Sequence, residues 1–439
     1  MRIWLKDEIL RRVLRNTGKM GAGKAAGALL HLGSIAVTAR ILDLTDFGLL
    51  MLFRSVAQGV AAVAKFQSWQ ALVHFAADPF ERGEYGAVRS LWIRLAVIDL
   101  GVGVTAMALG GAVAISASQS VGIPSEVAPL AALYCLIVPL QVSGTPTGIL
   151  RLADRFDLMA WQSLVTPSVR LVGVCIAYLA DAPLGAIVAA WVVSDILGDA
   201  FLWVCALGVA KAKGIARTVR SKSERVVPRT ILWRYLIGTN FNATLQQGAL
   251  PLLTLVIGSV FGASAAGAYR LAQTLLDAVL TPADLAMRSF FPEVSKLQSA
   301  KADRLRDIMR QVGLTSLWVS IPVAAALFLG AGLFVKLVAG DEYGSAGQLL
   351  AILAWTLPAL FLATLCETFM LGSGRAVVPV LSRAATVGVA LAVIWLFGAE
   401  MSLPDLGQVL LIASYAGLVI LAVPTGLALR RRRPVARQE

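Results

Sequence analysis

The run LAALYCLIVP at positions 130–139 decides how the rest of the sequence is interpreted, because the similar run LLAILAWTLP stands at 349–358. Pro139 and Pro358, which end these runs, are therefore 219 positions apart. The same offset relates two further pairs of landmarks, Gly48 with Gly267 and Lys211 with Arg430. The halves share few other residues, yet three landmarks with one offset predict a structural repeat.

Both runs are apolar, and so is most of the chain. Of its 439 residues, 58% are hydrophobic and 15% are charged, whereas soluble domains carry about 25% charged residues. A helix needs about 20 mostly apolar residues to cross a bilayer. The sequence therefore predicts an all-α polytopic membrane protein with about 12 transmembrane helices, at 22–42, 46–68, 91–117, 127–150, 159–180, 184–210, 235–260, 265–290, 311–337, 346–370, 376–398 and 406–429.

The charges are distributed unevenly over the connections between these helices. Alternate connections and the two ends hold 32 of the 39 Lys and Arg residues, and the connections between them hold none. The latter carry only acids, namely Asp43, Glu126, Asp181, Asp341, Glu342, Glu400 and Asp405. Positive charge stays on the cytoplasmic side of a membrane, so both termini are predicted to be cytoplasmic. The net charge of +13 then reflects topology and contact with membrane lipids rather than nucleic-acid binding.

Six helices per half is an even number, so both halves begin on the same side and form a parallel repeat. We expect two six-helix lobes with a central cavity. The predicted division is 1–21 as a cytoplasmic interfacial helix, 22–210 as the N-lobe, 211–234 as a basic cytoplasmic linker, 235–429 as the C-lobe and 430–439 as a basic cytoplasmic tail.

Polar stripes on four of the helices are the candidate substrate site. Each ionisable group at a helix centre costs about 2.5–3.5 kcal/mol on insertion scales, so it needs a partner or a wet cavity. The helix at 265–290 carries residues three or four apart, and the other three helices carry shorter rows: Arg270, Thr274, Asp277, Thr281, Asp284 and Arg288; Arg54, Gln58 and Lys65; Asn240, Thr244 and Gln247; His31, Ser34 and Thr38. We interpret these rows as walls of the cavity; the alternative is that they join helices of the bundle.

Other charges inside the predicted spans leave their roles open. Arg170 can pair with Asp195, Asp199 or Asp99, in either a structural or a functional cluster. Candidate groups for ion coupling are Asp277, Asp284 and Glu367, and Glu367 is alternatively a partner within its own lobe.

Several classes of function are disfavoured. Two histidines, short outward connections and the lack of a Walker-type glycine loop argue against an enzyme or an ATPase, and no cofactor or metal site is expected. The four cysteines all fall within predicted helices, so no disulfide is expected.

Three stretches resemble the lipopolysaccharide and exopolysaccharide (O-antigen type) flippases of the multidrug/oligosaccharidyl-lipid/polysaccharide exporter superfamily. They are TARILDLTDFGLLMLF (38–53), AGAYRLAQTLLDAVLTPADLAMRSFFPEVSKL (266–297) and VAGDEYGSAGQLLAILAW (338–355). The resemblance implies that the chain moves a polyprenyl-diphosphate-linked oligosaccharide across the bacterial inner membrane for cell-surface polysaccharide synthesis, by alternating access of two lobes. It also makes the polysaccharide polymerase machinery a candidate partner.

Under this hypothesis the cationic residues contact the pyrophosphate or an acidic sugar, because the planar guanidinium group matches phosphate geometry. We expect Arg54 and Arg270 to make those contacts, with Lys65 and Arg288 nearer the cytoplasmic opening, and Gln58, Asn240 and Asp277 also lining the site. The alternatives are a multidrug exporter of the same superfamily and a peptidoglycan-precursor flippase. A scaffold that transports nothing would not need the buried charges.

The predicted topology can be tested with single cysteines at Ser221 and Ser345, which should lie on opposite sides of the membrane because only the first stands in a basic connection. Labelling of intact cells with an impermeant maleimide should modify the cysteine at 345 and spare the one at 221. Modification of both from the same side would contradict the topology.

Overall fold

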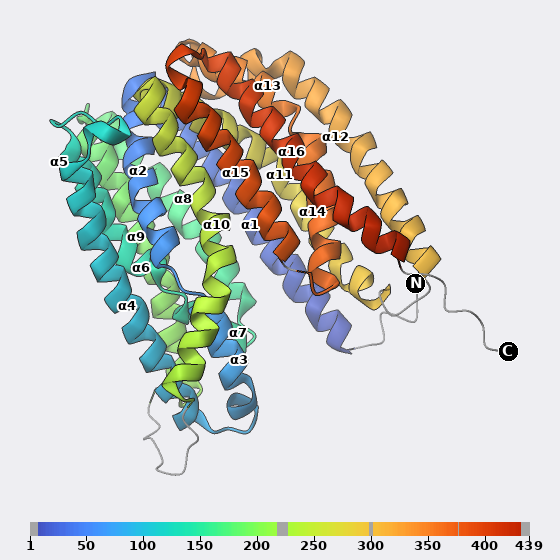
Figure 1. Ribbon diagram of the computed structural model, residues 1–439. Coiled ribbons are helices and arrows are strands. Elements are labelled where there is room, and N and C mark those ends of the chain that lie inside the picture. Colours follow the sequence, from blue (N-terminus) through green and yellow to red (C-terminus); the bar gives the residue numbers. More distant parts are fainter. Residues whose placement is uncertain (1–7, 217–226, 298–301, 376, 432–439) are drawn as a thin grey trace. The chain divides into compact units, whose positions relative to one another are not determined.

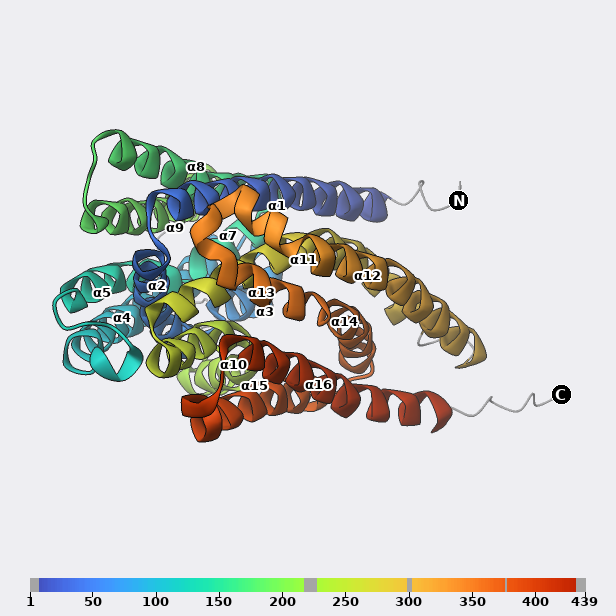
Figure 2. The same ribbon diagram turned by 90° about the horizontal axis from the view of Figure 1, so that it is seen from above.

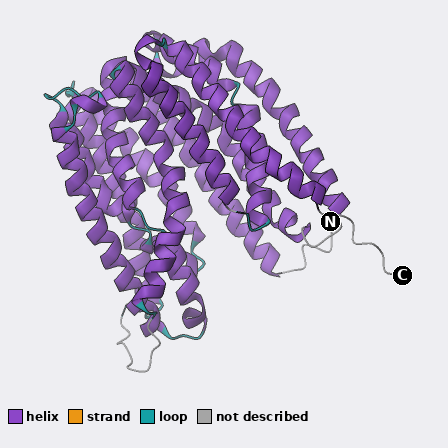
Figure 3. Ribbon diagram, in the orientation of Figure 1, coloured by secondary structure: helices purple, strands orange, loops and turns teal. Residues whose placement is uncertain are grey.

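The computed structural model describes residues 8–216, 227–297, 302–375 and 377–431, and within these ranges the chain forms helices and no strand (Figure 3). Figure 1 shows the helices in chain order. The first half contains α1 (Glu8–Ile41), α2 (Leu44–Ala64), α3 (Ser68–Glu81), α4 (Tyr85–Ser116), α5 (Ala128–Tyr134), α6 (Val138–Val142), α7 (Thr145–Leu152), α8 (Phe156–Leu179) and α9 (Leu184–Ala212). The second half contains α10 (Arg229–Phe261), α11 (Ala263–Leu297), α12 (Ala302–Ala339), α13 (Gly344–Ala354), α14 (Leu357–Gly372), α15 (Val377–Phe397) and α16 (Leu403–Arg431). Short 3-10 helices lie at Gln119–Val121, Cys135–Ile137, Asp341–Tyr343 and Gly398–Glu400.

The all-α polytopic membrane fold is confirmed, and each predicted span falls on a helix or on a run of consecutive helices. The count of about twelve spans is not confirmed. Among the described residues, nine helices are long and apolar enough to cross a membrane, or ten if the bent pair α13 and α14 forms one span. Neither α1 nor α11 is among them. For α11 the polar stripe explains this result, because Arg270, Gln273 and Asp277 lower its hydropathy.

The repeat is visible in where the helices begin. The helices α2 and α11 start at Leu44 and Ala263, and α9 and α16 start at Leu184 and Leu403, so each pair is separated by the same 219 positions. Both prolines of the opening motif stand at the second residue of a helix, Pro139 in α6 and Pro358 in α14, directly after a break. Proline has no backbone N–H to donate to a carbonyl of the preceding turn. This explains why the fourth predicted span of each half is broken there.

The described helices form two compact units. Unit 1 comprises Met1–Leu42 and Leu52–Leu252, and unit 2 comprises Asp43–Met51 and Leu253–Glu439. The boundaries lie in the turn between α1 and α2, within α2 and within α10, rather than in the basic segment 211–234. The lobes 22–210 and 235–429 therefore stay a prediction.

The expected interfacial helix, linker and tail are described only in part. The helix α1 runs without a break from Glu8, and α16 ends at Arg431. Residues 1–7, 217–226 and 432–439 lie outside the described ranges. The cytoplasmic assignment of these three segments is still a prediction.

In unit 1, α1 packs along α8, and α8 packs along α9 (Figure 2). A fully buried carboxylate, that of Asp99 in α4, connects two helix breaks in this unit. It accepts a hydrogen bond from the Ser68 hydroxyl at the start of α3, and another, of 3.0 Å, from the backbone N–H of Gly144 just before α7. The first N–H groups of a helix have no partner inside the helix. Asp99 therefore accepts from the buried N–H group at the start of α7 and, through Ser68, fixes where α3 begins.

In unit 2, the first turns of α2 and α11 contact each other through equivalent positions of the repeat. The hydroxyl groups of Thr45 and Ser264, 219 positions apart, lie at a hydrogen-bond distance of 2.9 Å. A Cβ atom on Gly48 would lie 1.9 Å from the carbonyl oxygen of Ala263, and one on Gly267 would lie 2.9 Å from the Gly48 Cα atom. Both glycines are thus required by the close approach of the two backbones.

Substitution of Gly48 by Ala should destabilise the protein by about 1–3 kcal/mol, because the new methyl group overlaps backbone atoms that cannot rotate away. Gly59 is the matched control on the same helix, since the nearest atom to a Cβ there is Pro251 Cβ at 3.8 Å. Gly59→Ala should be neutral or stabilise by up to about 1 kcal/mol through helix propensity. Thermal unfolding of the purified variants in detergent measures both, and equal melting temperatures would contradict the close packing.

Candidate functional site

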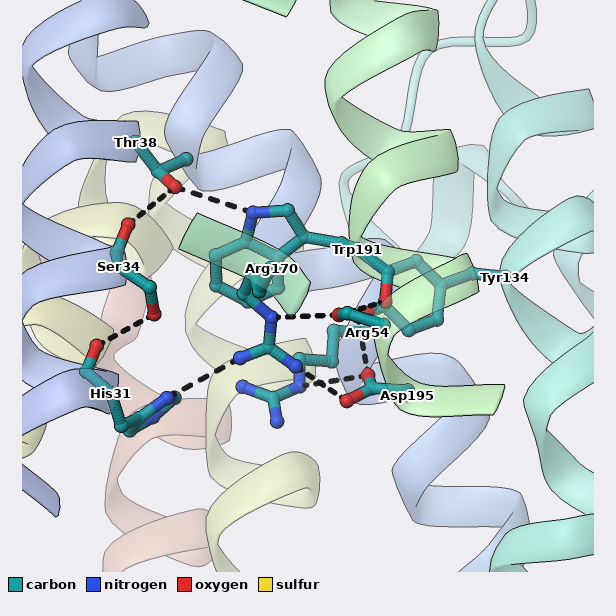
Figure 4. A network of polar contacts seen from close by, with 9 residues as sticks. His31, Ser34, Thr38, Arg54, Tyr134, Arg170, Trp191 and Asp195 are labelled. Carbon is teal, nitrogen blue, oxygen red and sulfur yellow. Dashed lines mark hydrogen bonds and ion pairs between the residues drawn. The ribbon is translucent and has the colours of Figure 1, made fainter. Parts of the chain in front are cut away.

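The charged side chains of α2, α8 and α9 meet inside unit 1 (Figure 4). Arg170 of α8 donates a hydrogen bond from Nη2 to Asp195 Oδ1 on α9. Arg54 of α2 forms an ion pair with the other oxygen of the same carboxylate, with 3.9 Å between its Nε and Asp195 Oδ2. The sequence left three possible partners for Arg170, and in the structure Arg170 pairs with Asp195.

Arg170 is held on every side and is only 1% exposed. Its Nε donates to the Ser194 hydroxyl at 3.1 Å, and its Nη1 lies 3.3 Å from His31 Nδ1. A guanidinium group can only donate, so His31 must present an unprotonated Nδ1 in this contact. The guanidinium carbon also lies 4.1 Å from the centre of the Trp191 ring. These contacts fix the group in one position.

Trp191 belongs to the same network. Its indole N–H donates to the Thr38 hydroxyl at 3.3 Å, and its backbone carbonyl accepts from Ser194. Thr38 and Ser34 in turn donate to carbonyls of the preceding turn of α1 (Figure 4). Thr38, the last residue of the polar row of α1, therefore bonds to the Trp191 ring, which both Arg54 and Arg170 contact.

Arg54 is held much less firmly. Its side chain is 13% exposed, and its guanidinium carbon lies 5.3 Å from the Trp191 ring centre. Its Nε has no hydrogen-bond partner among the described residues. The 3.9 Å ion pair with Asp195 is too long for a hydrogen bond. Two guanidinium groups therefore share one carboxylate, which leaves an excess of one positive charge.

A second group of charges lies along the same two helices. Lys65, just after the end of α2, interacts electrostatically with Asp199 and Asp99. Asp195 and Asp199 are four residues apart on α9, and so lie on one face of the helix. Lys65 thus has two acids near it, Asp99 and Asp199. Around Arg54 the balance is reversed, because two arginines share one acid. This arrangement can attract an anion near Arg54 and a cation near Lys65.

The remaining predicted site residues are distributed over both units. In unit 1, Gln58 is on α2, and Asn240 of α10 accepts a hydrogen bond of 3.4 Å from Thr244. In unit 2, Arg270 of α11 is 7% exposed, and Asp277 accepts from Gln273 at 3.2 Å. Their roles in binding stay predictions.

Three other candidates have different outcomes. The side chains of Asp284 and Arg288 lie outside the described residues. Glu367 accepts a hydrogen bond of 3.2 Å from Arg383 Nη2, so it has a partner in its own unit. Its role in ion coupling is untested. Among the described residues there is no group of three or more His, Cys, Asp and Glu side chains that could hold a metal ion.

Three residues of the network, Trp191, Ser194 and Tyr134, were not predicted from the sequence. Trp191 stands four residues before Asp195, so the helical spacing could have placed its ring beside the carboxylate. Tyr134 is the last residue of α5, and its hydroxyl donates to Asp195 Oδ2 at 3.0 Å. No sequence signal distinguishes this tyrosine from an ordinary apolar residue of the span.

Comparison with known proteins gives a family. The family model described as "Polysaccharide biosynthesis protein" matches residues 37–348, which is most of the chain. The chain belongs to this family. The chain is also 30% identical over 350 residues to the inner membrane protein YghQ of Escherichia coli (strain K12). The match covers 79% of this chain and 98% of that protein.

Solved structures show the same fold. The chain superposes on the inward-facing conformation of a multidrug resistance MATE family transporter of the MOP superfamily, with a TM-score of 0.66 and 13% identity, covering 95% of this chain and 96% of that one. It also superposes on the lipid II flippase MurJ, with a TM-score of 0.64 and 12% identity, covering 93% of this chain and 87% of that one. The protein therefore has the fold of these transporters.

Removal of the Arg170 side chain should be strongly destabilising. Arg170→Met leaves Asp195 with no bonded guanidinium group in a buried site, which should cost about 3–5 kcal/mol. The matched control is Arg155→Met, since Arg155 pairs with Asp157 at the surface, where ion pairs contribute at most about 1 kcal/mol. The fraction of monodisperse protein that survives heating in detergent measures both, and the double variant Arg170→Met with Asp195→Asn should recover part of the loss. Equal stability of the two single variants would contradict a buried pair.

Proposed function

We propose that this protein is a flippase that moves a polyprenyl-diphosphate-linked oligosaccharide repeat unit across the bacterial inner membrane, for the synthesis of a cell-surface polysaccharide. The single observation that carries the proposal is the positive excess at Arg54, inside the membrane-spanning part of unit 1. The family and the fold support it.

The chemistry of such a substrate requires this kind of site. The sugar hydroxyl groups would lack hydrogen-bond partners in hydrocarbon, at a cost of several kcal/mol each. The pyrophosphate needs compensating positive charge, and a guanidinium group offers paired donors that match it. Arg54 would bind the pyrophosphate, and Arg270 would be a second contact in unit 2.

The remaining roles follow from this proposal. Gln58 and Asn240 would hydrogen-bond the sugar, with Lys65 and Arg288 closer to the cytoplasmic opening. Alternating access of two lobes would expose the substrate to each side in turn. Asp277, Asp284 and Glu367 are the groups proposed for ion coupling. Both termini would be cytoplasmic, and a polysaccharide polymerase would use the product.

A multidrug exporter is the second candidate. The observation that favours it is the excess of carboxylates around Lys65, because Asp99 and Asp199 could attract a cationic drug. A peptidoglycan-precursor flippase would share the pyrophosphate contact and differ in the sugar. Genes for glycosyltransferases and a polymerase beside this one would favour the first proposal over both.

Substitution of either arginine should reduce export. In a strain whose surface polysaccharide depends on this gene, Arg54→Ala and Arg270→Ala should each lower surface polymer at least about tenfold, because each removes a charge-assisted hydrogen-bond donor. Arg270→Lys should restore only part of the activity, since an ammonium group lacks the bidentate geometry. Immunoblots of membranes must show normal amounts of each variant.

Arg82→Ala is the matched control, because Arg82 forms an exposed ion pair with Asp78 and should be dispensable. Normal export by both variants would contradict the proposed contacts. Loss of resistance to cationic drugs, with export unchanged, would favour the multidrug exporter.

A further inference from the structure

We propose that Tyr134 and Arg170 are positioning residues that hold the Asp195 carboxylate away from Arg54, and thereby keep the Arg54 guanidinium group available to an anionic headgroup of the pyrophosphate class. This inference rests on the proposed function, because it explains how the same site keeps its affinity for an anion. It concerns residues that do not themselves contact the substrate.

The argument begins with the two oxygens of Asp195. Oδ1 accepts from Arg170, and Oδ2 accepts from the Tyr134 hydroxyl at 3.0 Å. Arg54 Nε stands 3.9 Å from Oδ2. An N–H donor to a carboxylate normally comes to about 2.7–2.9 Å. The carboxylate is therefore held about 1 Å short of a full bond with Arg54.

Tyr134 is placed for this role by the break in its span. It is the last residue of α5, is fully buried, and precedes the 3-10 helix at Cys135–Ile137. Its ring is buried, and its hydroxyl points to Asp195 of α9 (Figure 4). A neutral hydroxyl bonds to the carboxylate without adding charge. Tyr134 thus occupies an oxygen of Asp195 but leaves the positive excess unchanged.

The second half of the chain builds a similar helix plan without this network. The positions 219 residues later carry no member of it. His31, Tyr134, Arg170, Trp191, Ser194 and Asp195 correspond to Leu250, Leu353, Val389, Leu410, Ala413 and Ser414, and Arg54 corresponds to Gln273. The helices α11 and α16 begin 219 positions after α2 and α9, and they do so without these groups. A network that one half builds and the other omits is better explained by binding than by helix packing.

Asp195 still has a purpose beside Arg54. Without it, two guanidinium groups would stand together beside the Trp191 ring with no counter-charge, at a cost of about 2.5–3.5 kcal/mol each on insertion scales. One carboxylate, bonded to the deeper arginine, lowers that cost. When an anion binds, Arg54 exchanges its long contact with Asp195 for a direct hydrogen bond to the anion.

The test measures binding of inorganic pyrophosphate to the purified full-length protein in detergent, by isothermal titration calorimetry at one low ionic strength. In Tyr134→Phe, Asp195 Oδ2 loses a donor and should turn to Arg54, so that the Kd for pyrophosphate should rise about tenfold, the value of one charge-assisted hydrogen bond. Tyr343→Phe is the matched control, because it removes a buried tyrosine hydroxyl that donates to the Asp43 carbonyl at 3.3 Å. Its Kd should equal that of the wild type.

Asp195→Asn provides a second variant with the opposite expectation. It removes the competing anion, so pyrophosphate should bind more tightly than to the wild type. If one of the two variants fails to fold, the other still decides. A Tyr134→Phe variant that binds as well as the wild type, or an Asp195→Asn variant that binds more weakly, would overturn the inference.

Arg54→Gln separates this inference from the proposed function. It should weaken pyrophosphate binding at least about tenfold, because it removes the proposed guanidinium contact. If it does, and Tyr134→Phe has no effect, then the positioning role fails while the anion contact stands. If Arg54→Gln binds pyrophosphate as tightly as the wild type, or if the wild type does not bind pyrophosphate, then both proposals fail.

Discussion

A charge inside a bilayer must find an opposite charge or water, and the structure of unit 1 depends on how its helices satisfy this requirement. Asp195 bonds to Arg170 of α8, and Arg170 in turn contacts His31 of α1 and Ser194 and Trp191 of α9. Asp99 satisfies it in another way, with a hydroxyl and a backbone N–H at helix starts. In both cases a single carboxylate fixes the positions of several elements, because leaving it without donors would cost several kcal/mol.

The two halves of the chain share a backbone plan and differ in what they place on it. Proline breaks the corresponding span of each half at the same position. In the first half this break brings the Tyr134 hydroxyl to a half-buried acid, Asp195, whereas Leu353 takes the corresponding position in the second half. The charges of unit 2 follow other helices, as in the pair of Arg383 with Glu367. One fold can thus carry two different polar interiors.

Much of the fold could be predicted from the sequence, because hydropathy and the 219-residue offset are one-dimensional signals. The helices, the repeat and the breaks at Pro139 and Pro358 all follow from them. The partner of Arg170 could not be chosen among three acids, since the choice depends on how each helix is rotated. The shared use of Asp195 by two arginines, and the hydroxyl of Tyr134, depend on contacts between spans that no local pattern records. The boundaries of the two units inside α2 and α10 are likewise a property of packing.

Gly48 contacts Gly267, and Thr45 lies at a hydrogen-bond distance from Ser264. In each pair, a residue of the first half contacts the residue at the equivalent position of the second half. This is how the two copies in a symmetric homodimer meet, where a residue on the axis faces itself. In such a dimer every substitution is made twice, so an added arginine would appear on both sides at once. A single chain that encodes both halves is free of that restriction. It can keep the self-facing glycines that join the halves and still give only one half a tyrosine, a tryptophan and two arginines around an acid.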